Sequence, residues 1–246
     1  MTVLLAARDG VAAEVLSAKA GPADAPGVYS MHAVAVVDAS PLAMRHVIAR
    51  MCDYKDQLPY IAYCRIFKSE GRTAWSYGVV DAPVFDARDY VIASTIDEDL
   101  RPDGTGVYRS RWELSPDVGP RPREGALRLQ VNQGRWELRG IDGGKRTEMR
   151  YFIRTAPGGV IPGWVAGYVA RTTLPDYVRT LERLAQDEER KGKVMVPGAN
   201  PWDGVNVAAL DDPLPPLNQK KAATAGLFPP APPPPPLPSP VPGDPR

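Results

Sequence analysis

The chain has 246 residues, with 30 Lys and Arg against 29 Asp and Glu and a formal net charge of +1. This balance argues against a protein that binds nucleic acid, because such a protein would carry a concentrated basic surface. No apolar run approaches the roughly 18 residues of a membrane-spanning helix, and the start MTVLLAARDG reaches charged residues too soon for a secretory signal. These features predict a cytoplasmic protein whose membrane contact is at most peripheral.

Two cysteines, Cys52 and Cys64, lie twelve residues apart and form no CxxC pair. This spacing suggests neither a disulfide framework nor a zinc knuckle, so the sequence predicts two reduced thiols. Nucleophile elbows, phosphate-binding loops and paired metal-binding histidines are also missing from the sequence. We therefore expect no cofactor and no metal.

The excess of proline lies mostly after Pro213, in a tail that ends LFPPAPPPPPLPSPVPGDPR. Such a segment cannot pair its backbone N–H groups or bury a core, and it samples extended polyproline II. We place the domain boundary near residue 200, with a folded domain over 1–200 and a disordered tail over 201–246 whose first part is partly packed. The tail is expected to be solvated, and docking in an aromatic-lined groove of a partner protein is the alternative.

Taken in chain order, the first predicted elements are two strands and a helix. Residues 10–18 form a weak strand pattern, and residues 28–37 (VYSMHAVAVV) form a clear one. Ser40 and Pro41 then supply cap and first-turn chemistry, which predicts a helix over 40–54.

From residue 60 onward the pattern has a period of two, which is typical of strands. The predicted strands cover residues 60–69, 73–82, 88–96, 106–114, 125–141 and 145–154. The long strand is expected to bend at Gln133-Gly134. Hairpin-type turn signals, among them Glu70-Gly71 and Asp103-Gly104, predict that these strands are antiparallel neighbours.

Strands 106–114 and 145–154 each alternate an apolar with a charged face, so the apolar side needs a cover. The helix at 40–53 and the long segment 161–190 are the segments that can supply one. Pro175 interrupts the apolar stripe of the long segment, which predicts one kinked helix or two in tandem. The pattern thus predicts an α+β fold, with an antiparallel sheet wrapped around a long C-terminal helix. The stripe consists of Ile161, Trp164, Val165, Tyr168, Val169, Thr172, Val178, Leu181 and Leu184.

Several motifs, in the same order, resemble the START (StAR-related lipid-transfer) domain family. They are Pro83 before the Arg88-Asp89-Tyr90 triplet, Gly134-x-Trp136-x-Leu138, the turn Gly144-Lys145-Arg146-Thr147 and the run Pro-Gly-Gly-x-Ile-Pro-x-Trp at 157–164. The resemblance covers about residues 9–190 and is that of a bacterial-type member of the helix-grip superfamily. The fold it implies is a curved antiparallel sheet gripping the C-terminal helix around an apolar tunnel. The activity it implies is non-catalytic binding of one lipid (a sterol, a phospholipid or a related molecule) and its transfer between membranes.

The chain departs from the family pattern at two points. The family usually has an amphipathic helix before its first strand, whereas here the strand pattern starts near residue 9, so that helix is vestigial or lies in missing upstream residues. Cholesterol carriers place an acidic and a basic residue face to face in the tunnel, and the aligned positions here hold Trp75 and Ser94. We therefore expect an apolar ligand with a small polar head, or a ligand shaped unlike cholesterol.

The alternation and the resemblance together predict which residues line the tunnel. From the strands they are Trp75, Tyr77, Tyr90, Ile92, Ser94, Tyr108, Trp112, Met149 and Tyr151, and from the helix Trp164, Tyr168 and Thr172. Such walls offer a lipid a wide apolar area with a few hydroxyl and indole groups. The plain structural alternative is that these aromatic side chains fill a core.

Opening of the tunnel is expected at loop 97–106 and at the glycine junction 158–163 before the C-terminal helix. Arg88 and Asp89 are adjacent in a strand and point to opposite faces, so we expect each to bond a different neighbour. They are not expected to form a catalytic pair.

Two other functions stay open. An aromatase/cyclase on the same fold would need a general acid or base in the cavity, but His32 and His46, the two histidines of the chain, have no obvious carboxylate partner. A ligand-sensing adaptor would use the Pro-rich tail to recruit a partner protein.

Overall fold

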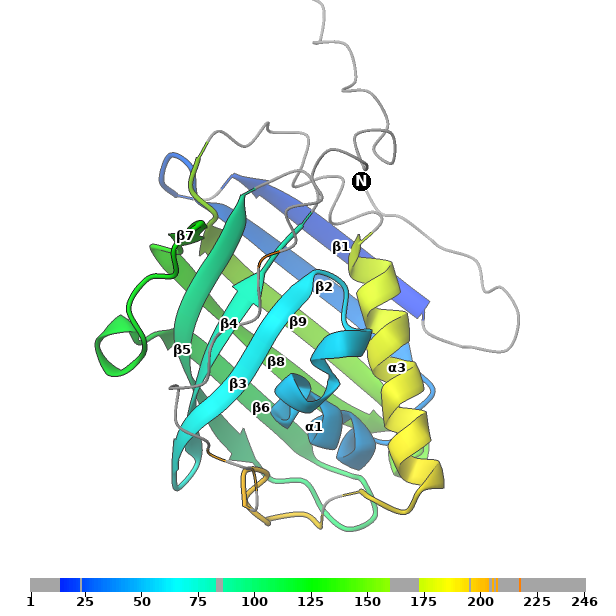
Figure 1. Ribbon diagram of the computed structural model, residues 1–246. Helices are drawn as coiled ribbons and strands as arrows, with labels where there is room; N and C mark the ends of the chain where they lie inside the picture. Colours follow the sequence, from blue (N-terminus) through cyan, green and yellow to red (C-terminus); the bar gives the residue numbers. More distant parts are fainter. Residues whose placement is uncertain are drawn as a thin grey trace, which may run out of the picture.

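The computed structural model describes residues 14–22, 24–82, 86–159, 173–194, 196–203, 205, 207 and 217. They build a nine-stranded sheet in the order β1-β2-β9-β8-β6-β5-β4-β3, with β7 added beside β5. The sheet curves around the helices α1 and α3, as Figure 1 shows.

The strands are β1 Glu14–Pro22, β2 Tyr29–Val37, β3 Ile61–Glu70, β4 Thr73–Val80, β5 Ala87–Glu98, β6 Val107–Leu114, β7 Ala126–Arg128, β8 Val131–Ile141 and β9 Arg146–Ala156. The helices are α1 Pro41–Ala49 and α3 Leu174–Arg190, with 3-10 turns η1 Met51–Gln57, η2 Pro116–Val118 and η3 Asp142–Gly144. The predicted α+β helix-grip class is confirmed.

The long strand predicted over 125–141 is broken earlier than expected. It divides after Arg128 into β7, which pairs in parallel with β5, and β8, which pairs antiparallel with β6 and β9. The break comes from tertiary contacts, because the Leu129 N–H donates to the Asp89 carbonyl at 3.0 Å and the Asp89 carboxylate holds Arg128. The bend expected at Gln133-Gly134 stays a prediction, and the pairing of β8 with β9 runs through these two residues without a shift in register.

Helix α1 begins as the sequence predicts. The Ser40 hydroxyl accepts a hydrogen bond from the Ala43 N–H at 3.3 Å, and Pro41 occupies the first turn. The α-helix ends at Ala49, and the rest of the predicted helix is the 3-10 turn η1. This turn brings Cys52 against strand β3.

The prediction of two reduced thiols is wrong for this structure, because Cys52 and Cys64 form a disulfide. Their spacing of twelve residues hides the contact, since one lies on η1 and the other on β3. The bridge fixes the end of the covering helix to the sheet.

Helix α3 packs its apolar stripe against α1 and β2, and Val178, Leu181 and Leu184 of that stripe are buried. The described helix starts at Leu174-Pro175, where a proline is tolerated in the first turn. Residues 160–172 lie outside the described part of the chain, and so does the predicted kink or tandem arrangement.

Carboxylates of α3 hold the start of α1 in place. Glu182 accepts from the Asp38 N–H at 2.6 Å, and Glu189 accepts from the Ser40 N–H at 3.0 Å. Gln186 donates to the Asp38 carbonyl at 2.8 Å. Negative charge beside the N-terminus of a helix is favourable, so these contacts fix the position of α3 over the sheet.

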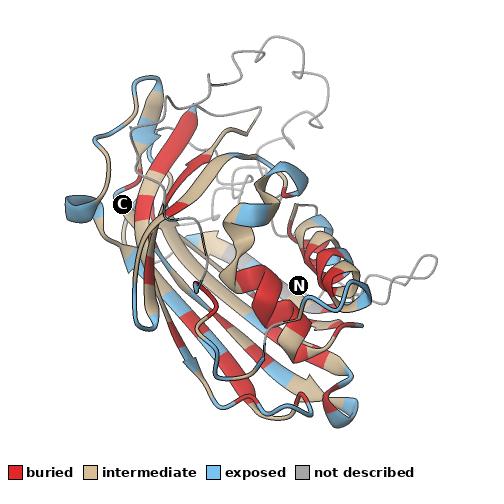
Figure 2. Ribbon diagram, turned by 60° about the horizontal axis from the view of Figure 1, so that its bottom comes forward, coloured by how far each residue is buried: buried red, intermediate tan, exposed pale blue. Residues whose placement is uncertain are grey.

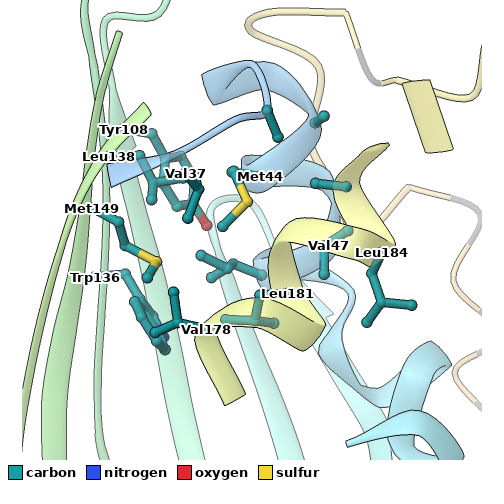
Figure 3. Close-up of a cluster of buried hydrophobic side chains, with 14 of the residues drawn as sticks. Val37, Met44, Val47, Tyr108, Trp136, Leu138, Met149, Val178, Leu181 and Leu184 are labelled. Carbon is teal, nitrogen blue, oxygen red and sulfur yellow. The ribbon is translucent and has the colours of Figure 1, made fainter. Parts of the chain in front are cut away.

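The main core lies where α1 and α3 meet the concave face of the sheet. Figure 3 shows Met44 of α1 facing the strand residues Leu138 and Met149, and Val47 of α1 beside Leu184 of α3. The buried residues gather on α1 and on the facing side of α3 in Figure 2. Among the described residues, no helix is long and apolar enough to cross a membrane, and no cluster of His, Cys, Asp and Glu could hold a metal ion.

Candidate ligand-binding cavity

A cavity of about 520 Å³ lies between the concave face of the sheet, α1, η1 and the start of α3. It is continuous with the core but is not filled by protein side chains. Its wall is mostly apolar, and its described residues come from seven strands as well as from the helices. The volume is within the range of about 300–1,000 Å³ that is typical of small-molecule sites.

Small inward-facing residues explain why the cavity is open. Ala74, Ser76 and Gly78 alternate along the inner face of β4, and Ser94 and Ser110 continue this surface on β5 and β6. These positions place little volume above the sheet. A core built from larger residues would have closed the space.

Two glycines let aromatic rings lie flat on the sheet beneath the cavity. A Cβ atom on Gly78 would lie 2.4 Å from Cζ of Tyr90, and a Cβ atom on Gly134 would lie 2.3 Å from Cζ2 of Trp112. Each ring therefore covers a backbone position of the neighbouring strand, and the space above it stays free.

The structure brings five of the predicted tunnel residues together at the cavity wall. Tyr90, Ile92 and Ser94 come from β5, Trp112 from β6 and Tyr151 from β9. The three predicted helix residues, Trp164, Tyr168 and Thr172, lie outside the described residues.

Four predicted residues lie away from the cavity. Trp75 and Tyr77 are on the opposite face of β4, because Ala74, Ser76 and Val80 take the inner face. The placement of Trp75 and Tyr77 on the inner face is therefore wrong by one residue of register.

Each of these two side chains has a different neighbourhood. The Trp75 indole N–H donates to the Ser115 hydroxyl at 3.3 Å, with the Lys68 ammonium 4.5 Å from the ring centroid. Tyr77 is buried in a second cluster with Val79 and Val91. Trp75 and Ser94 consequently cannot face one another, as their alignment with the cholesterol-carrier pair would require.

Tyr108 and Met149 face inward as predicted, but they lie deeper than the cavity. Both are fully buried in the core beneath α1 and α3, where Figure 3 shows them. The alternation of β6 and β9 correctly predicts that both side chains face inward. It cannot predict which inward residues pack against a helix and which line the cavity.

Sequence reasoning missed several wall residues. Asn132 and Trp136 flank Gly134 on the inner face of β8, so the alternation of that strand contained the signal. The disulfide Cys52–Cys64 and Trp202 also line the cavity. Cys52 and Trp202 come from segments outside the strands, for which a strand pattern carries no signal, whereas Cys64 lies on β3.

The polar groups of the wall are mainly neutral. Asn132 accepts a hydrogen bond from the Trp112 indole N–H at 3.0 Å, and Tyr177 donates its hydroxyl hydrogen to the Met51 sulfur at 2.9 Å. Burial raises the pKa of Tyr90 to about 12. Burial also raises the pKa of Tyr151, and the nearby Tyr90 raises it slightly further. Both hydroxyls therefore stay protonated and can donate hydrogen bonds inside the cavity.

Arg88 is the charged residue among the described wall residues, and its guanidinium is engaged by backbone. It donates to the carbonyls of Pro157 at 2.9 Å and Gly158 at 3.1 Å, and also to the Asp86 carbonyl. Arg88 thus ties the exit of β9 to the end of the cavity.

Asp89 turns to the opposite face of β5, where it is fully buried. Its carboxylate accepts from the Arg128 guanidinium at 2.8 and 2.9 Å, from the Tyr77 hydroxyl at 3.1 Å and from the Arg123 N–H at 2.9 Å. The prediction that Arg88 and Asp89 bond different neighbours is confirmed.

The described wall contains no Asp, Glu, Lys or His. His46 of α1 is buried near the Glu188 carboxylate of α3, with 3.9 Å between Nε2 and Oε2, so the expectation that it has no carboxylate partner needs correction. His32 is exposed on β2, where its ring contacts Phe152.

Loop 97–106 contributes no residue to the described wall. The Asp99 side chain accepts from the Val107 N–H at 2.7 Å, and the Arg101 N–H donates to the Thr105 carbonyl at 2.9 Å. The loop also packs against the β8–β9 connection, since a Cβ on Gly104 would lie 2.8 Å from the Gly144 carbonyl oxygen. These contacts fix the loop away from the cavity.

No family model matches the chain. An uncharacterized protein of Pseudomonas aeruginosa is 34% identical over 119 residues, which are 46% of this chain and 55% of that protein. The chain therefore spans about half the length of the curated relative it matches.

Solved structures of START-type domains share the fold. A STAR-related lipid transfer protein of Xanthomonas axonopodis is 22% identical, with 74% of this chain and 98% of that chain covered and a TM-score of 0.55. Human STARD10 is 16% identical, with 87% and 83% covered and a TM-score of 0.60. Human StAR-related lipid transfer protein 5 is 13% identical, with 76% and 88% covered and a TM-score of 0.55.

Proposed function

Because the chain has the helix-grip fold of START-type domains, we propose that it binds a single hydrophobic lipid in its cavity and carries it between membranes without covalent chemistry. The observation that carries this proposal is the apolar cavity of about 520 Å³ between the sheet and the helices. An aqueous carrier needs such a site, because a lipid is held in water only if most of its apolar surface is buried.

The wall favours an uncharged ligand. The described wall residues offer hydroxyl and amide groups such as those of Tyr90, Tyr151 and Asn132, whereas Arg88 is already bonded to three backbone carbonyls. A charged head would have to leave water without a partner of opposite charge, which is strongly unfavourable. A sterol-like or isoprenoid-like lipid with one hydroxyl or carbonyl group fits this surface better than a phospholipid.

The expected affinity is compatible with transport. A ligand of about 30 non-hydrogen atoms at about 0.3 kcal/mol per atom gains roughly 9 kcal/mol, which corresponds to a Kd of about a micromolar or below. Such an affinity holds the lipid in water and still permits its release at a membrane surface.

We place ligand entry at the end of the cavity that is lined by Arg88, Pro157 and Thr173. Pro157 and Thr173 flank the predicted glycine junction and the first half of the C-terminal helix. The Arg88 bonds to the Pro157 and Gly158 carbonyls hold the residues that follow β9 against this part of the wall. Of the two gates expected from the sequence, we retain the junction and do not propose loop 97–106.

The aromatase/cyclase alternative has no observation in its favour, because the described wall supplies neither a carboxylate nor an imidazole as general acid or base. The two functions give different products. A carrier returns its lipid unchanged, whereas a cyclase alters the mass or the absorption spectrum of the bound molecule.

The first experiment is native mass spectrometry of the purified chain, with lipid extraction and a liposome-to-liposome transfer assay. We expect co-purification of one uncharged lipid and transfer of that lipid between liposomes. Trp112→Arg should reduce transfer at least tenfold because it places a charge in the wall, and Trp75→Arg on the opposite face is the matched control. If Trp112→Arg fails to fold, Ser94→Leu fills part of the same cavity without a charge. Transfer that is equal in wild type and both cavity variants would contradict the proposal.

A further inference from the structure

The chain that follows α3 returns to the cavity. We call residues 196–203 the strap. Figure 1 shows this segment, in orange shades, crossing the end of the molecule near α1 after the end of α3. Its Ala199 carbonyl accepts from the Arg45 guanidinium of α1 at 2.5 Å, and the Trp202 indole N–H donates to the Ala49 carbonyl at 3.0 Å. The strap is thus bonded to the middle and to the end of α1.

The strap is docked on a buried ion pair. The Arg45 side chain is 0% exposed and is paired with Glu98, whose side chain is 2% exposed. A buried guanidinium needs acceptors for its N–H groups, and Ala199 supplies one that Glu98 does not. Docking of the strap therefore adds an acceptor for Nη2 of a charged group that is buried inside the domain.

The strap has local hydrogen bonds that present Trp202 toward the domain. The Trp202 N–H donates to the Asn200 side-chain oxygen at 3.2 Å, and the Asp203 N–H donates to the Asn200 carbonyl at 3.1 Å. Trp202 is 3% exposed and lines the cavity together with Ile48, Ala49 and Met51. A tryptophan that is buried against an open apolar cavity has part of its ring facing that space.

We propose that Trp202 is a ligand-contacting residue and that the strap closes the cavity on its α1 side, so that undocking of the strap opens a route for the ligand. This inference rests on the proposed lipid-binding function. It adds a wall residue from outside the segment that resembles START domains, which ends near residue 190. It also connects the occupancy of the cavity to the segment from which the Pro-rich tail extends.

Two tryptophans of the full-length chain provide a matched test. Trp202→Ala removes the side chain that closes the wall, and Trp75→Ala removes a tryptophan on the outer face of β4. The measurement is the dissociation rate of NBD-cholesterol, a neutral fluorescent lipid, into excess liposomes. We expect dissociation from Trp202→Ala to be about tenfold faster than from wild type, because the ligand loses a wall and gains an exit, and Trp75→Ala to change the rate less than twofold.

A conservative variant and a labelling experiment distinguish the loss of a ligand contact at Trp202 from a failure of the variant to fold. Trp202→Phe keeps an aromatic ring in the wall and should restore most of the slow dissociation, whether or not Trp202→Ala folds. A photoreactive cholesterol should label the peptide that contains Trp202 in the wild-type chain. If wild type holds NBD-cholesterol but Trp202→Ala and Trp202→Phe release it at the wild-type rate, the strap proposal is overturned and lipid binding stands. If wild type holds neither this probe nor an extracted lipid, the proposed function is overturned as well.

Discussion

Single residues decide whether the concave face of the sheet becomes a core or a cavity. Gly78 and Gly134 accept the flat rings of Tyr90 and Trp112, and the neighbouring serines add little volume. The aromatic residues in this region are as bulky as core residues, but they are laid along the sheet and do not fill the space above it. Sequence composition therefore indicates a core, whereas the glycine positions indicate a cavity.

Gly78→Ala should reduce lipid binding with little loss of stability. The new methyl group would displace the outer end of the Tyr90 ring, which lines the cavity. We expect Kd for the bound lipid to rise about fivefold to tenfold, roughly 1 kcal/mol, measured by fluorescence titration.

Two other glycines serve as comparisons for this variant. Gly21→Ala meets nothing within 4 Å and should leave both binding and stability unchanged. Gly134→Ala would also collide with the Phe152 carbonyl oxygen, 2.3 Å from the new Cβ, so it should reduce stability and binding together. Unchanged affinity in Gly78→Ala would contradict the flat-ring explanation of the cavity.

At the scale of elements, the position of η1 against β3 depends on the disulfide between Cys52 and Cys64. Both half-cystines line the cavity, so the bridge is also part of the ligand wall. In a reducing compartment the bridge would open, and η1 would be held by packing alone.

Loss of the bridge should destabilise the domain. The double variant Cys52→Ser/Cys64→Ser should lower the free energy of unfolding by about 2–3 kcal/mol, as expected for a closed loop of this size. Urea denaturation with and without dithiothreitol measures this difference. The reductant should shift wild type toward the double variant and leave the double variant unchanged, and an equal midpoint for all four samples would refute the expectation.

The sequence predicts elements better than it predicts their contacts. Five of the six strands predicted between residues 60 and 154, the Ser40 cap and the buried part of the α3 stripe follow from local patterns, and the structure confirms them. The remaining strand, predicted over 125–141, is divided into β7 and β8. Three features depend on partners far away in the sequence: the break at Arg128, the disulfide, and the docking of Trp202 on α1. The prediction of the inward face of β4 was wrong for a different reason. Trp75 and Tyr77 are apolar enough to suggest that their side of the strand faces inward, whereas the inward side carries the small residues.

At the scale of the whole molecule, stability depends on the contact between α1 and α3, and this contact contains a buried histidine. The pKa of His46 is lowered mainly by burial and further by Arg50 and Arg45, while Glu188 and Asp53 oppose the shift. The folded protein therefore binds a proton at His46 less readily than the unfolded chain does. This contribution to stability is present above the unfolded pKa of about 6.5 and is lost as pH falls toward the folded value.

Acidification should consequently weaken the fold through His46. We expect the urea midpoint to be lower at about pH 5 than at about pH 7 in wild type, and to change less between these values in His46→Gln. His32→Gln, which changes an exposed histidine on β2, should keep the wild-type dependence. If the urea midpoint of His46→Gln changes with pH as much as that of wild type, other titrating groups cause the loss of stability.

The open cavity also has a thermodynamic consequence for the empty protein. At about 24 cal/mol per Å³ of void, a space of about 520 Å³ leaves on the order of 10 kcal/mol of packing unrealised, as large as the whole stability of a typical domain. Water admitted by the wall hydroxyls offsets part of this loss, and a lipid recovers far more of it. The ligand therefore completes the hydrophobic core, and loading should raise the melting temperature steeply. In a cell, where unfolded chains are degraded, the amount of this protein would then follow the supply of its lipid.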